Sequence, residues 1–415
     1  MKMKKYDLIV AGGGFAGCAA ALSAAREGMS VFLVEKGNAL GGAPSNCLVI
    51  PYMPFWTTVR GEKFFLSGGV FDEINDRLTK YQAYDGSSVF NEEFLKIVLA
   101  DMLQEAGVEF LFHTILLGAS CQEGVVHSVS VANKAGVTVL EADYFIDATG
   151  DGDLAARAGF PYRLGREEDN LCQPMTLCFR LGNVDTEHLD RGKVNRVYKE
   201  FKKQGKIRNP REDVLIFSTL LHGVVHMNTT RIVKRNPTDP FDVTRAEIEA
   251  RHQILEIYEF LKNHIEEFKN CELLSSAPAI GVRESRMIEG EYYLTGEELM
   301  KCPKFEDSIA LGNYDIDIHN PEGEGTSHYF FPHGQYYSIP YRCLIPKGAK
   351  NLLVSGRCIS VDHYAQASIR IMPIVCTLGQ AAGSAIAVAY QEKKNVKDIN
   401  MDELHSLLSK NKAVF

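Results

Sequence analysis

A glycine-rich turn near the N-terminus restricts the fold of this chain more than any other feature. The apolar run from Tyr6 to Ala11 leads into Gly12-Gly13-Gly14-Phe15-Ala16-Gly17, and an alanine-rich helical pattern follows. Gly12 permits a tight turn, Gly14 lets the backbone approach a pyrophosphate, and Gly17 lets the helix pack against the strand. Free N–H groups at the helix N-terminus then face the anion. The pattern predicts a strand, a turn and a helix that form a dinucleotide cradle.

An acidic residue follows at the distance that a ribose contact requires. Ser30 to Val34 predicts a second strand, and Glu35 closes it with seventeen residues between it and Gly17. Its carboxylate can accept hydrogen bonds from a ribose diol. A purely structural glycine turn is the alternative, but strand, helix and acid stand in the order that cofactor binding requires.

The overall composition is that of a globular protein with a modest negative charge. The 415 residues include 45 Lys or Arg and 53 Asp or Glu, which gives a net charge of −8. This balance argues against a nucleic-acid binder. The densest basic stretch, Arg191 to Arg211, is interrupted by acidic and apolar residues, so we interpret it as a solvated helix face.

The cysteines and histidines predict neither disulfides nor a metal site. None of the ten cysteines forms a CxxC pair, and the N-terminus lacks the features of a secretory signal. We therefore expect reduced thiols and a cytoplasmic location. Cys172 and Cys178 are too isolated for an iron–sulfur cluster, and His222 and His226 lie in a β-rich stretch that is unlike a zinc helix.

A long uncharged segment near the C-terminus raises the question of a membrane span. Ile371 to Gln391 carries no formal charge and contains Gly379-xxx-Gly383, a pattern of membrane helix dimers. Its residues are mostly small, and Pro373 stands where a helix would start. We predict a buried helix that lies close to the sheet or to a cofactor, and no membrane contact.

The order of elements predicts one interrupted domain. Asn91 can cap a helix that ends at Gly107, with Phe94, Ile97, Val98, Met102 and Leu103 on its apolar face. Strand patterns follow at 108–112, 125–132, 137–141 and 144–148, in the manner of an antiparallel meander. The last one runs into a second glycine turn at Gly150.

The character of the sequence changes from about Pro161. Strand patterns at 176–181, 214–219 and 223–228 surround the charged helix. Thr244-x-x-Glu247 then predicts a capping box before a long helix, whose apolar side would comprise Ile248, Leu255, Tyr258, Leu261, Ile265 and Phe268. We predict a discontinuous domain of residues 1–160 and 340–415, with residues 161–339 inserted as a mixed α/β substrate domain.

Further motifs complete a pattern that spans nearly the whole chain. Beyond the N-terminal turn and Glu35, they are Gly41-Gly42, Ala148-Thr149-Gly150-Asp151-Gly152-Asp153, Gly281-Val282-Arg283-Glu284-Ser285-Arg286, Ile339-Pro340-Tyr341-Arg342, Gly356-Arg357, and Ser368-Ile369-Arg370 through Gly379-Gln380-Ala381-Ala382-Gly383. In this order the chain resembles the FAD-dependent oxidoreductase family, which is related to the fumarate reductase and glutathione reductase flavoproteins. The resemblance implies a Rossmann-like FAD-binding domain.

The same resemblance implies which residues surround the cofactor. The first motif would hold the ADP pyrophosphate, the Gly356-Arg357 segment would approach the ribityl portion, and the N-terminus of the last helix would point toward the flavin ring. Oriented N–H dipoles there match the negative charge of a reduced flavin. The implied shell consists of Gly12, Gly14, Phe15, Ala16, Gly17, Glu35, Lys36, Gly41, Gly42, Ala43, Ala148, Gly150, Asp153, Gly356, Arg357 and Met372.

One departure from the related disulfide reductases limits the chemistry. Those enzymes carry a cysteine pair just after the Gly-Gly turn, whereas this chain has the single Cys47. Disulfide reduction is therefore disfavoured, and a small buried residue is the preferred interpretation of Cys47. No histidine stands in an obvious flavinylation context, which favours noncovalent FAD.

The candidate catalytic residues come from the insertion and from the C-terminal segment. Arg283 and Arg286 could orient an anionic or polar substrate through forked hydrogen bonds. His363 and Arg370 resemble in placement the histidine and arginine before the final helix of fumarate-reductase-like enzymes, and His363 could transfer a proton. The alternatives are an ordinary ion pair between Arg283 and Glu284, a structural salt bridge for Arg370, and a capped loop histidine for His363.

We therefore predict an enzyme that transfers a hydride between a small polar or anionic substrate and flavin N5. One alternative is a flavin-binding electron-transfer subunit that acts with a protein partner. Another is a nicotinamide-only Rossmann protein, in which the later motifs would have no role. The sequence leaves open the substrate, a homo-oligomer and a redox partner.

Overall fold

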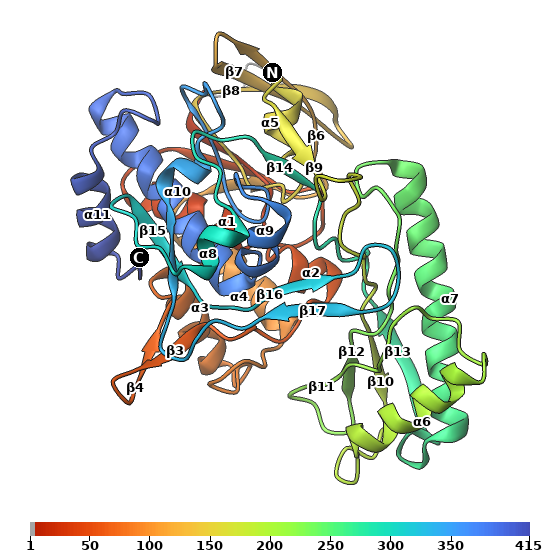
Figure 1. Ribbon diagram of the computed structural model, residues 1–415. Helices are drawn as coiled ribbons and strands as arrows, with labels where there is room; N and C mark the ends of the chain where they lie inside the picture. Colours follow the sequence, from red (N-terminus) through yellow and green to blue (C-terminus); the bar gives the residue numbers. More distant parts are fainter. Residues whose placement is uncertain (1–4) are drawn as a thin grey trace.

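The computed structural model describes residues 5–415 and is built around a parallel sheet (Figure 1). Its neighbouring strands are, in order, β5 (Glu109–Leu111), β2 (Val31–Val34), β1 (Tyr6–Ala11), β8 (Gly136–Asp147) and β19 (Leu352–Val354). Ile9, for example, lies between Phe32 on β2 and Phe145 on β8. The two ends of the chain thus contribute to one Rossmann-like sheet, and the predicted mixed α/β fold is confirmed. Residues 1–4, at the start of the predicted first domain, lie outside the described residues.

The long strand β8 belongs to two layers. Its first half pairs antiparallel with β7 (Val125–Asn133), which pairs with β6 (Ile115–Gln122). From Ala142 onward it pairs in parallel with β1. An antiparallel meander is present, but β6 was not predicted, and the strand expected at 108–112 pairs in parallel with β2 instead. The strands expected at 137–141 and 144–148 are a single strand, because neither Gly nor Pro interrupts the extended chain between them.

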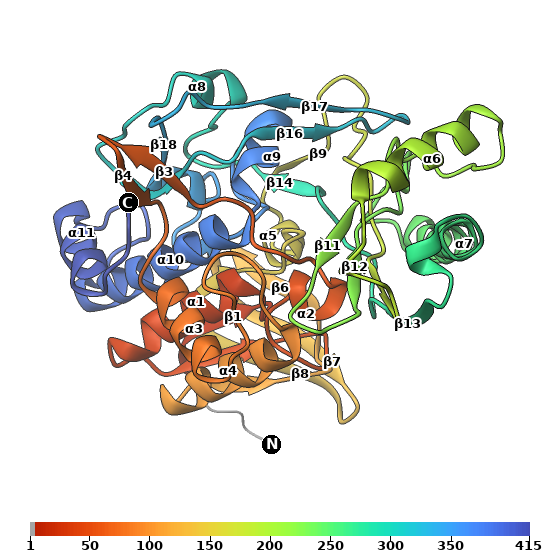
Figure 2. The same cartoon turned by 90° about the horizontal axis from the view of Figure 1, so that it is seen from below.

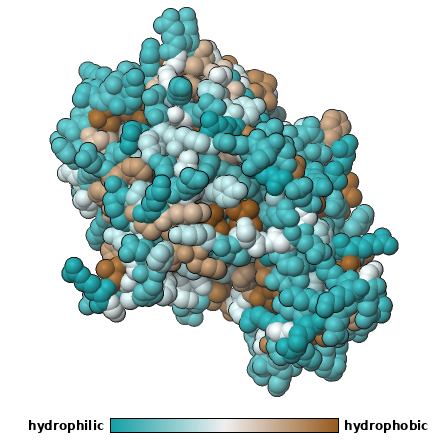
Figure 3. Space-filling view, in the orientation of Figure 1, coloured by the Kyte–Doolittle hydropathy of each residue, from teal (hydrophilic) through white to brown (hydrophobic). Residues whose placement is uncertain are grey.

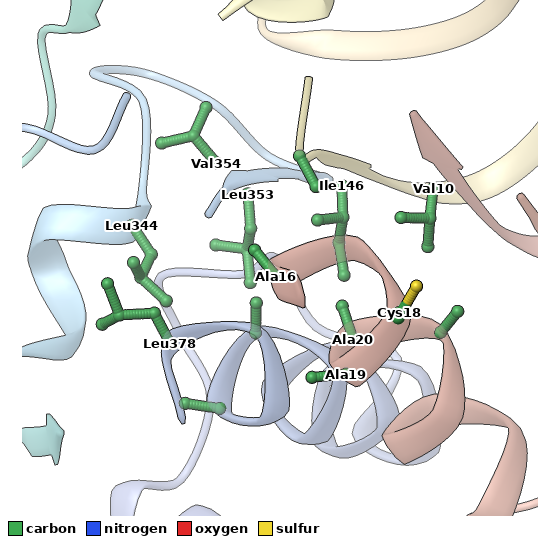
Figure 4. Close-up of a cluster of buried hydrophobic side chains, with 14 of the residues drawn as sticks. Val10, Ala16, Cys18, Ala19, Ala20, Ile146, Leu344, Leu353, Val354 and Leu378 are labelled. Carbon is green, nitrogen blue, oxygen red and sulfur yellow. The ribbon is translucent and has the colours of Figure 1, made fainter. Parts of the chain in front are cut away.

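Helix α10 (Met372–Glu392) packs along helix α1 (Phe15–Arg26) through its small residues (Figure 4). A Cβ added at Gly379 would lie 2.1 Å from the Ala16 carbonyl oxygen, and one at Gly383 would lie 2.1 Å from that of Ala20. By length and composition α10 could cross a membrane, yet 94% of its most apolar window is buried. The predicted buried helix is confirmed.

Helix α4 (Glu92–Glu105) begins and ends close to its predicted bounds. The Asn91 side chain accepts a hydrogen bond from the Glu93 N–H at 2.9 Å, as an N-cap does. The predicted apolar face is partly wrong: Ile97 is half exposed, whereas Leu95 and Leu99 are buried with Val98 and Met102. The core faces a stripe one position away from the predicted one.

A second hydrophobic core lies in a lobe beside the parallel sheet (Figures 1 and 2). Its antiparallel sheet contains, in order, β11 (Ile216–Ser218), β12 (Val225–Met227), β10 (Phe179–Gly182) and β13 (Glu272–Ser276). Helices α6 (Arg191–Lys203) and α7 (Pro240–His264) flank it. Apart from Leu48, its buried members lie between Met175 and Ile280, whereas Met287 to Ile345 contribute to the first core.

Helix α7 differs from its prediction in both its start and its buried face. It begins at Pro240, and the Asp239 side chain caps it by accepting from the Asp242 N–H at 2.9 Å. The predicted capping box is wrong, because Thr244 already lies within the helix and donates to the Pro240 carbonyl. The predicted apolar face is partly wrong: Ile248 and Leu255 are more than half exposed, whereas Leu261, Ile265 and Phe268 are buried as predicted. The other buried apolar residues of the helix are Ala246, Ala250, Ile254, Ile257 and Phe260.

Short elements connect these layers. They are α2 (Ala43–Cys47), β3 (Trp56–Val59), β4 (Glu62–Phe65), α3 (Val70–Lys80), α5 (Asp153–Arg157), β9 (Tyr162–Leu164), η1 (Glu266–Phe268), β14 (Arg286–Ile288), α8 (Gly296–Met300), β15 (Ser308–Gly312), β16 (Ile316–His319), β17 (Thr326–Tyr329), β18 (Tyr337–Pro340), η2 (Tyr341–Leu344), α9 (His363–Ile369) and α11 (Met401–Lys410). The hairpin of β16 and β17 runs between α9 and the second lobe (Figures 1 and 2).

Candidate functional site

The N-terminus of α1 is held by close backbone contacts that only glycine allows. Gly12 has a φ of +98°, and a Cβ there would lie 2.4 Å from the Ala148 carbonyl oxygen. A Cβ at Gly17 would lie 1.8 Å from the Gly12 oxygen. Gly14 is the N-cap and supplies no side-chain acceptor, so the first N–H groups of α1, including those of Phe15 and Ala16, face outward from the helix end.

Three distant segments converge on this helix end. Gly41 and Gly42 lie against Gly14, since a Cβ at Gly42 would come within 2.8 Å of the Gly14 Cα. Gly356 lies on another side, where its Cβ would be 3.4 Å from that of Ala16. Gly150 belongs to the third segment, and a Cβ there would lie 2.5 Å from Nη1 of Arg357, which follows Gly356. The structure therefore brings together glycines from four predicted motifs.

The space at the helix end fits a dinucleotide. A Cβ at Gly14 would meet only the Gly42 Cα, at 3.8 Å, so crowding by the described residues does not explain the missing side chain. A pyrophosphate that approaches the backbone does explain it. Met372 is buried at the start of α10, whose N-cap Ile371 likewise offers no side-chain acceptor, so a second helix end presents oriented N–H dipoles.

Glu35 lies beside the turn with its carboxylate already engaged. Its Oε2 accepts from the Gly13 N–H at 2.7 Å, and its Oε1 accepts from the Gly37 N–H at 2.6 Å. Each oxygen has a second lone pair for a ribose hydroxyl. Lys36 and Ala43 are exposed at the rim. The spacing between Gly17 and Glu35 in the sequence did not predict the hydrogen bond between Glu35 and Gly13.

Asp147 shapes the second glycine turn, and the sequence analysis missed it. This buried carboxylate accepts from the Thr149 N–H and hydroxyl and from the Ala155 N–H, so it holds Ala148 and Gly150 in place at the start of α5. Burial raises its pKa, although the three hydrogen bonds oppose the shift. The signal available in the sequence was an acidic residue at the end of an otherwise apolar strand segment.

Arg357 and Asp151 form an ion pair at the centre of the converging segments. Nη2 of Arg357 lies 2.5 Å from Oδ1 of Asp151, which also accepts from the Ser285 hydroxyl at 2.7 Å. Burial acts to raise the pKa of Asp151, but the charges of Arg357 and Lys36 outweigh it, so the pKa is lowered. Nε of Arg357 and the buried hydroxyl of Ser45 on α2 have no partner among residues 5–415, which leaves polar atoms for a cofactor.

Two of the predicted site residues contact each other. Nη1 of Arg286 donates to Oδ1 of Asp153 at 2.9 Å and to the Asp151 carbonyl at 3.1 Å. This pair joins β14 to α5. A substrate role for Arg286 and a cofactor role for Asp153 stay predictions.

Arg283 and Arg370 lie in a shared polar interior. Nη1 of Arg283 donates to the Pro174 carbonyl and to the Thr176 hydroxyl, both at 2.6 Å. Burial, followed by the charge of Arg370, lowers the pKa of Arg283 to about 9. Arg283 forms no salt bridge with a carboxylate among residues 5–415, whereas Nη2 of Arg370 lies 3.5 Å from Oδ2 of Asp317.

Asp317 and His319 on β16 complete this interior and were not identified from the sequence. Nε2 of His319 lies 3.2 Å from Oδ2 of Asp317, and its Nδ1 lies 3.0 Å from Nη2 of Arg231. Because an arginine only donates, Nδ1 must accept and Nε2 must carry the hydrogen. Burial and the charge of Arg283 hold the pKa of His319 well below its usual range. Asp317 and His319 alternate with isoleucines along β16, and this pattern was the signal available in the sequence.

His363 is paired with Glu284 and not exposed in a loop. It is the first residue of α9, which is capped by Asp362 through the Ala365 N–H at 2.6 Å. Its Nδ1 lies 2.7 Å from Oε1 of Glu284, which is fully buried. The expected alternative, an ion pair between Arg283 and Glu284, is absent from the salt bridges of residues 5–415, because Glu284 pairs with His363 instead.

His363 also lines a cavity of about 590 Å³, together with Tyr364 of α9 and residues of the β16–β17 hairpin such as Thr326 and Ser327. Figure 3 shows the face of Figure 1, on which hydrophilic side chains predominate and apolar ones gather near the middle, between the two lobes. The wall of the cavity is polar, and Arg166 is neutralised there by Asp169 at 2.6 Å.

Two further groups are poorly suited to thiol redox chemistry and to metal binding: the Cys47 thiol, and the cluster of Asp315, Asp317 and His328. Burial raises the pKa of the Cys47 thiol to about 11, which makes it a poor nucleophile. Asp315, Asp317 and His328 place ligand atoms within 4.8 Å of one another. Nδ1 of His328 contacts Oδ2 of Asp315 at 2.5 Å, and Arg370 lies beside Asp317, so positive charge already occupies this group. That the chain has no metal site stays a prediction.

Comparisons with known proteins agree with this geometry. Residues 7–408 match the family model described as FAD dependent oxidoreductase. Digeranylgeranylglycerophospholipid reductase 2 of Methanothermobacter thermautotrophicus is 29% identical over 195 residues, which are 44% of this chain and 48% of that protein. Soluble pyridine nucleotide transhydrogenase of Mycobacterium bovis is 36% identical over 84 residues, which are 19% of this chain and 17% of that protein. The chain thus spans less than half of the length of these curated relatives.

A comparison with solved structures agrees with the fold through one of them. The flavin-dependent brominase Bmp2 has a TM-score of 0.50 at 12% identity, with 99% of this chain and 84% of that chain covered. A geranylgeranyl bacteriochlorophyll reductase-like protein from Thermoplasma acidophilum has a TM-score of 0.49 at 13% identity, with 99% and 85% covered.

Proposed function

This chain belongs to the FAD-dependent oxidoreductase family, and on that premise we propose that it oxidises or reduces a small anionic substrate by hydride transfer at flavin N5. FAD supplies the two-electron chemistry when it is bound. The protein binds it noncovalently through the end of α1, Glu35, the Gly41–Gly42 turn and the Gly356–Arg357 segment. The polar interior of Arg283, Arg370 and His363 binds the substrate.

The observation that carries this proposal is the state of Arg283. Its side chain is partly buried and donates to neutral groups, and it forms no salt bridge with a carboxylate among residues 5–415, although the charge of Asp317 acts against that of Arg370. A partly buried charge that lacks a direct carboxylate partner is costly. A substrate carboxylate would remove this cost and would be oriented by the forked guanidinium.

His363 is the candidate proton carrier. It lines the cavity and stands on α9, seven residues before Arg370, which leads directly into the N-terminus of α10. A hydride transfer to or from a polar carbon requires a proton to move at the neighbouring atom, and an imidazole can accept or donate it. Arg370 orients the substrate from the same helix end.

We propose in addition that the FAD-binding domain, in residues 1–160 and 340–415, is of the glutathione reductase and fumarate reductase type, and that residues 161–339 cover the substrate as an inserted domain. The separate core from Met175 to Ile280 supports an insertion, although the buried residues from Met287 to Ile339 pack in the first core. On this proposal the protein acts on a small-molecule substrate. Ten free cysteines support a cytoplasmic location.

An anaerobic screen tests the function. Oxidised holoprotein is mixed with anionic and neutral metabolites, and loss of the yellow flavin absorbance is recorded. We expect bleaching by a carboxylate, with affinity weakened at least tenfold in Arg283→Met at unchanged FAD content. Arg196→Met, which removes an exposed arginine, is the matched control. Bleaching only by a protein partner would reject the proposal in favour of an electron-transfer subunit.

A further inference from the structure

We infer that two copies of this chain associate through helix α7, with the two helices antiparallel about a two-fold axis. The inference concerns assembly, so it does not depend on the proposed reaction. It starts from three apolar side chains on the outer face of α7, Phe241, Ile248 and Leu255, which together form the outer stripe. They are 71%, 55% and 51% exposed, respectively.

The spacing of the outer stripe places its side chains on one line along the helix. Its members are seven residues apart, and seven residues make almost two turns of an α-helix, with a drift of about 20°. At a rise of about 1.5 Å per residue the stripe is roughly 21 Å long. Single exposed apolar residues are ordinary on a protein surface. A repeat of seven along an exposed helix, in contrast, is the pattern of a helix that packs against another helix.

The packing of α7 within its own chain leaves the outer stripe uncovered. The helix lies at the outer edge of the second lobe (Figures 1 and 2). Its inner face contributes Ala250 and Ile257 to the second core. The buried side chain of Gln253 accepts from the Arg231 N–H at 2.8 Å and donates to the Arg231 carbonyl at 3.0 Å. These contacts hold α7 in one rotation, which presents the outer stripe to solvent.

Two opposite charges flank the outer stripe on one edge. Arg245 and Glu259 are exposed, and they lie fourteen residues apart with His252 midway between them. One nitrogen of Arg245 contacts Asp242 at 3.2 Å, but the Arg245 side chain is 62% exposed. No salt bridge of α7 within residues 5–415 involves Glu259. The edge is therefore positive in its first half and negative in its second half.

This pattern is complementary to itself when a second copy runs antiparallel. With the two-fold axis beside His252, Ile248 of one helix lies against Leu255 of the other, and Arg245 lies against Glu259. Each contact occurs twice, because a two-fold axis repeats it. A parallel pair would instead bring each charge beside its own copy, and like charges repel. Charges at the edge of an apolar seam select the orientation of paired helices in this way.

Neighbouring side chains fit the same arrangement. The permanent positive charge nearest the axis is that of Arg251, and it is neutralised by Glu247 of the same helix at 2.6 Å. The alkyl stem of Arg251 can then cover the apolar seam. At the end of the seam, the exposed ring of Phe241 lies near the half-buried Tyr258 of the second copy.

Analytical ultracentrifugation of the FAD-loaded protein over a wide range of concentration tests the inference. We expect a monomer–dimer equilibrium in the parent. Ile248→Asp and Leu255→Asp change exposed positions, so each variant should keep its fold and its FAD content. Each should raise the dissociation constant at least about 100-fold, because an unpaired charge enters the contact twice.

Charge reversal tests the orientation of the helices. Arg245→Glu or Glu259→Arg alone places like charges together in both repeats of the contact and should raise the dissociation constant about tenfold. The two substitutions combined restore opposite charges and should return the constant to within about threefold of the parent. Lys134→Glu, an equal change of charge at the exposed turn between β7 and β8, is the matched control and should have no effect.

Three results would overturn the inference. A parent protein that is monomeric at every concentration leaves the outer stripe to another kind of partner. A dimer that survives both aspartate substitutions uses another face. A dimer that single charge reversals weaken and the combined reversal does not restore is not antiparallel in this register. None of these results affects the proposed reaction, which is tested by bleaching of the flavin.

Discussion

Gly379 of α10 lies directly against Ala16 of α1, so that a Cβ at Gly379 would come within 2.1 Å of the Ala16 carbonyl oxygen. The contact fixes α10 against α1, the helix whose N-terminus is the proposed cofactor contact. It also explains why α10 is composed of small residues. The position of the proposed pyrophosphate site therefore depends on the packing of α10.

Gly379→Val should destabilise the protein and weaken FAD binding together. The branched side chain must push α10 away from α1, at a cost of about 1–3 kcal/mol or more. Urea unfolding and FAD titration of the apoprotein measure the two effects. Gly323→Ala is the control, because a Cβ there has open space and the backbone is unstrained. Full stability in Gly379→Val would contradict the packing described here.

Glu35→Gln should reduce the affinity for FAD by about 10- to 100-fold, because the amide nitrogen cannot accept from Gly13 or Gly37 and one buried N–H loses its acceptor. The ribose also loses an ionised acceptor. Quenching of flavin fluorescence on binding to the apoprotein measures the dissociation constant. Equal affinity in the variant and the parent would remove Glu35 from the cofactor site.

Binding of an unreactive carboxylate should depend on Arg283. Burial lowers the pKa of Arg283, but a guanidinium keeps its charge between pH 7 and pH 10, so the attraction for an anion should persist over this range. Perturbation of the flavin spectrum by the ligand reports binding. In Arg283→Met the affinity should be at least tenfold lower at every pH. Equal affinity in the variant and the parent would remove Arg283 from the substrate site.

His226→Phe should reduce the acid sensitivity of the fold. His226 is fully buried on β12, neither ring nitrogen has a partner among residues 5–415, and burial lowers its pKa to about 3. The unfolded chain takes up this proton at a pH near 6.5, so folding stability is retained above that pH and is lost as the pH falls toward 3. Between pH 7 and pH 4 the parent should lose about 3 kcal/mol more than the variant.

Urea unfolding at the two pH values measures this difference. His222→Phe is the matched control, since His222 is exposed and lies four residues away. An equal loss of stability in the parent and in His226→Phe would show that His226 gains its proton without cost.

Local sequence patterns were sufficient to predict the elements that depend only on interactions between residues close in the chain. The turn from Gly12 to Gly17 and the cap at Asn91 follow from backbone geometry and from one side-chain hydrogen bond, and both could be predicted. The face of α7 could not, because Ile248 and Ala246 compete for burial and only the sheet beneath the helix decides between them. The helix was therefore right and its predicted face only partly so: Leu261, Ile265 and Phe268 are buried, whereas Ile248 and Leu255 are not.

The sequence by itself determined the dinucleotide cradle, the buried character of α10 and the residue types that FAD chemistry requires. Tertiary structure alone decided that Glu284 pairs with His363 and not with Arg283, that Asp317 contacts His319 and Arg370, and that Arg283 forms no salt bridge within residues 5–415. The physical reason is the distance along the chain over which each interaction acts. Conformational preferences act between neighbours in the chain, whereas charge pairing depends on distances that exist only after remote segments have packed together.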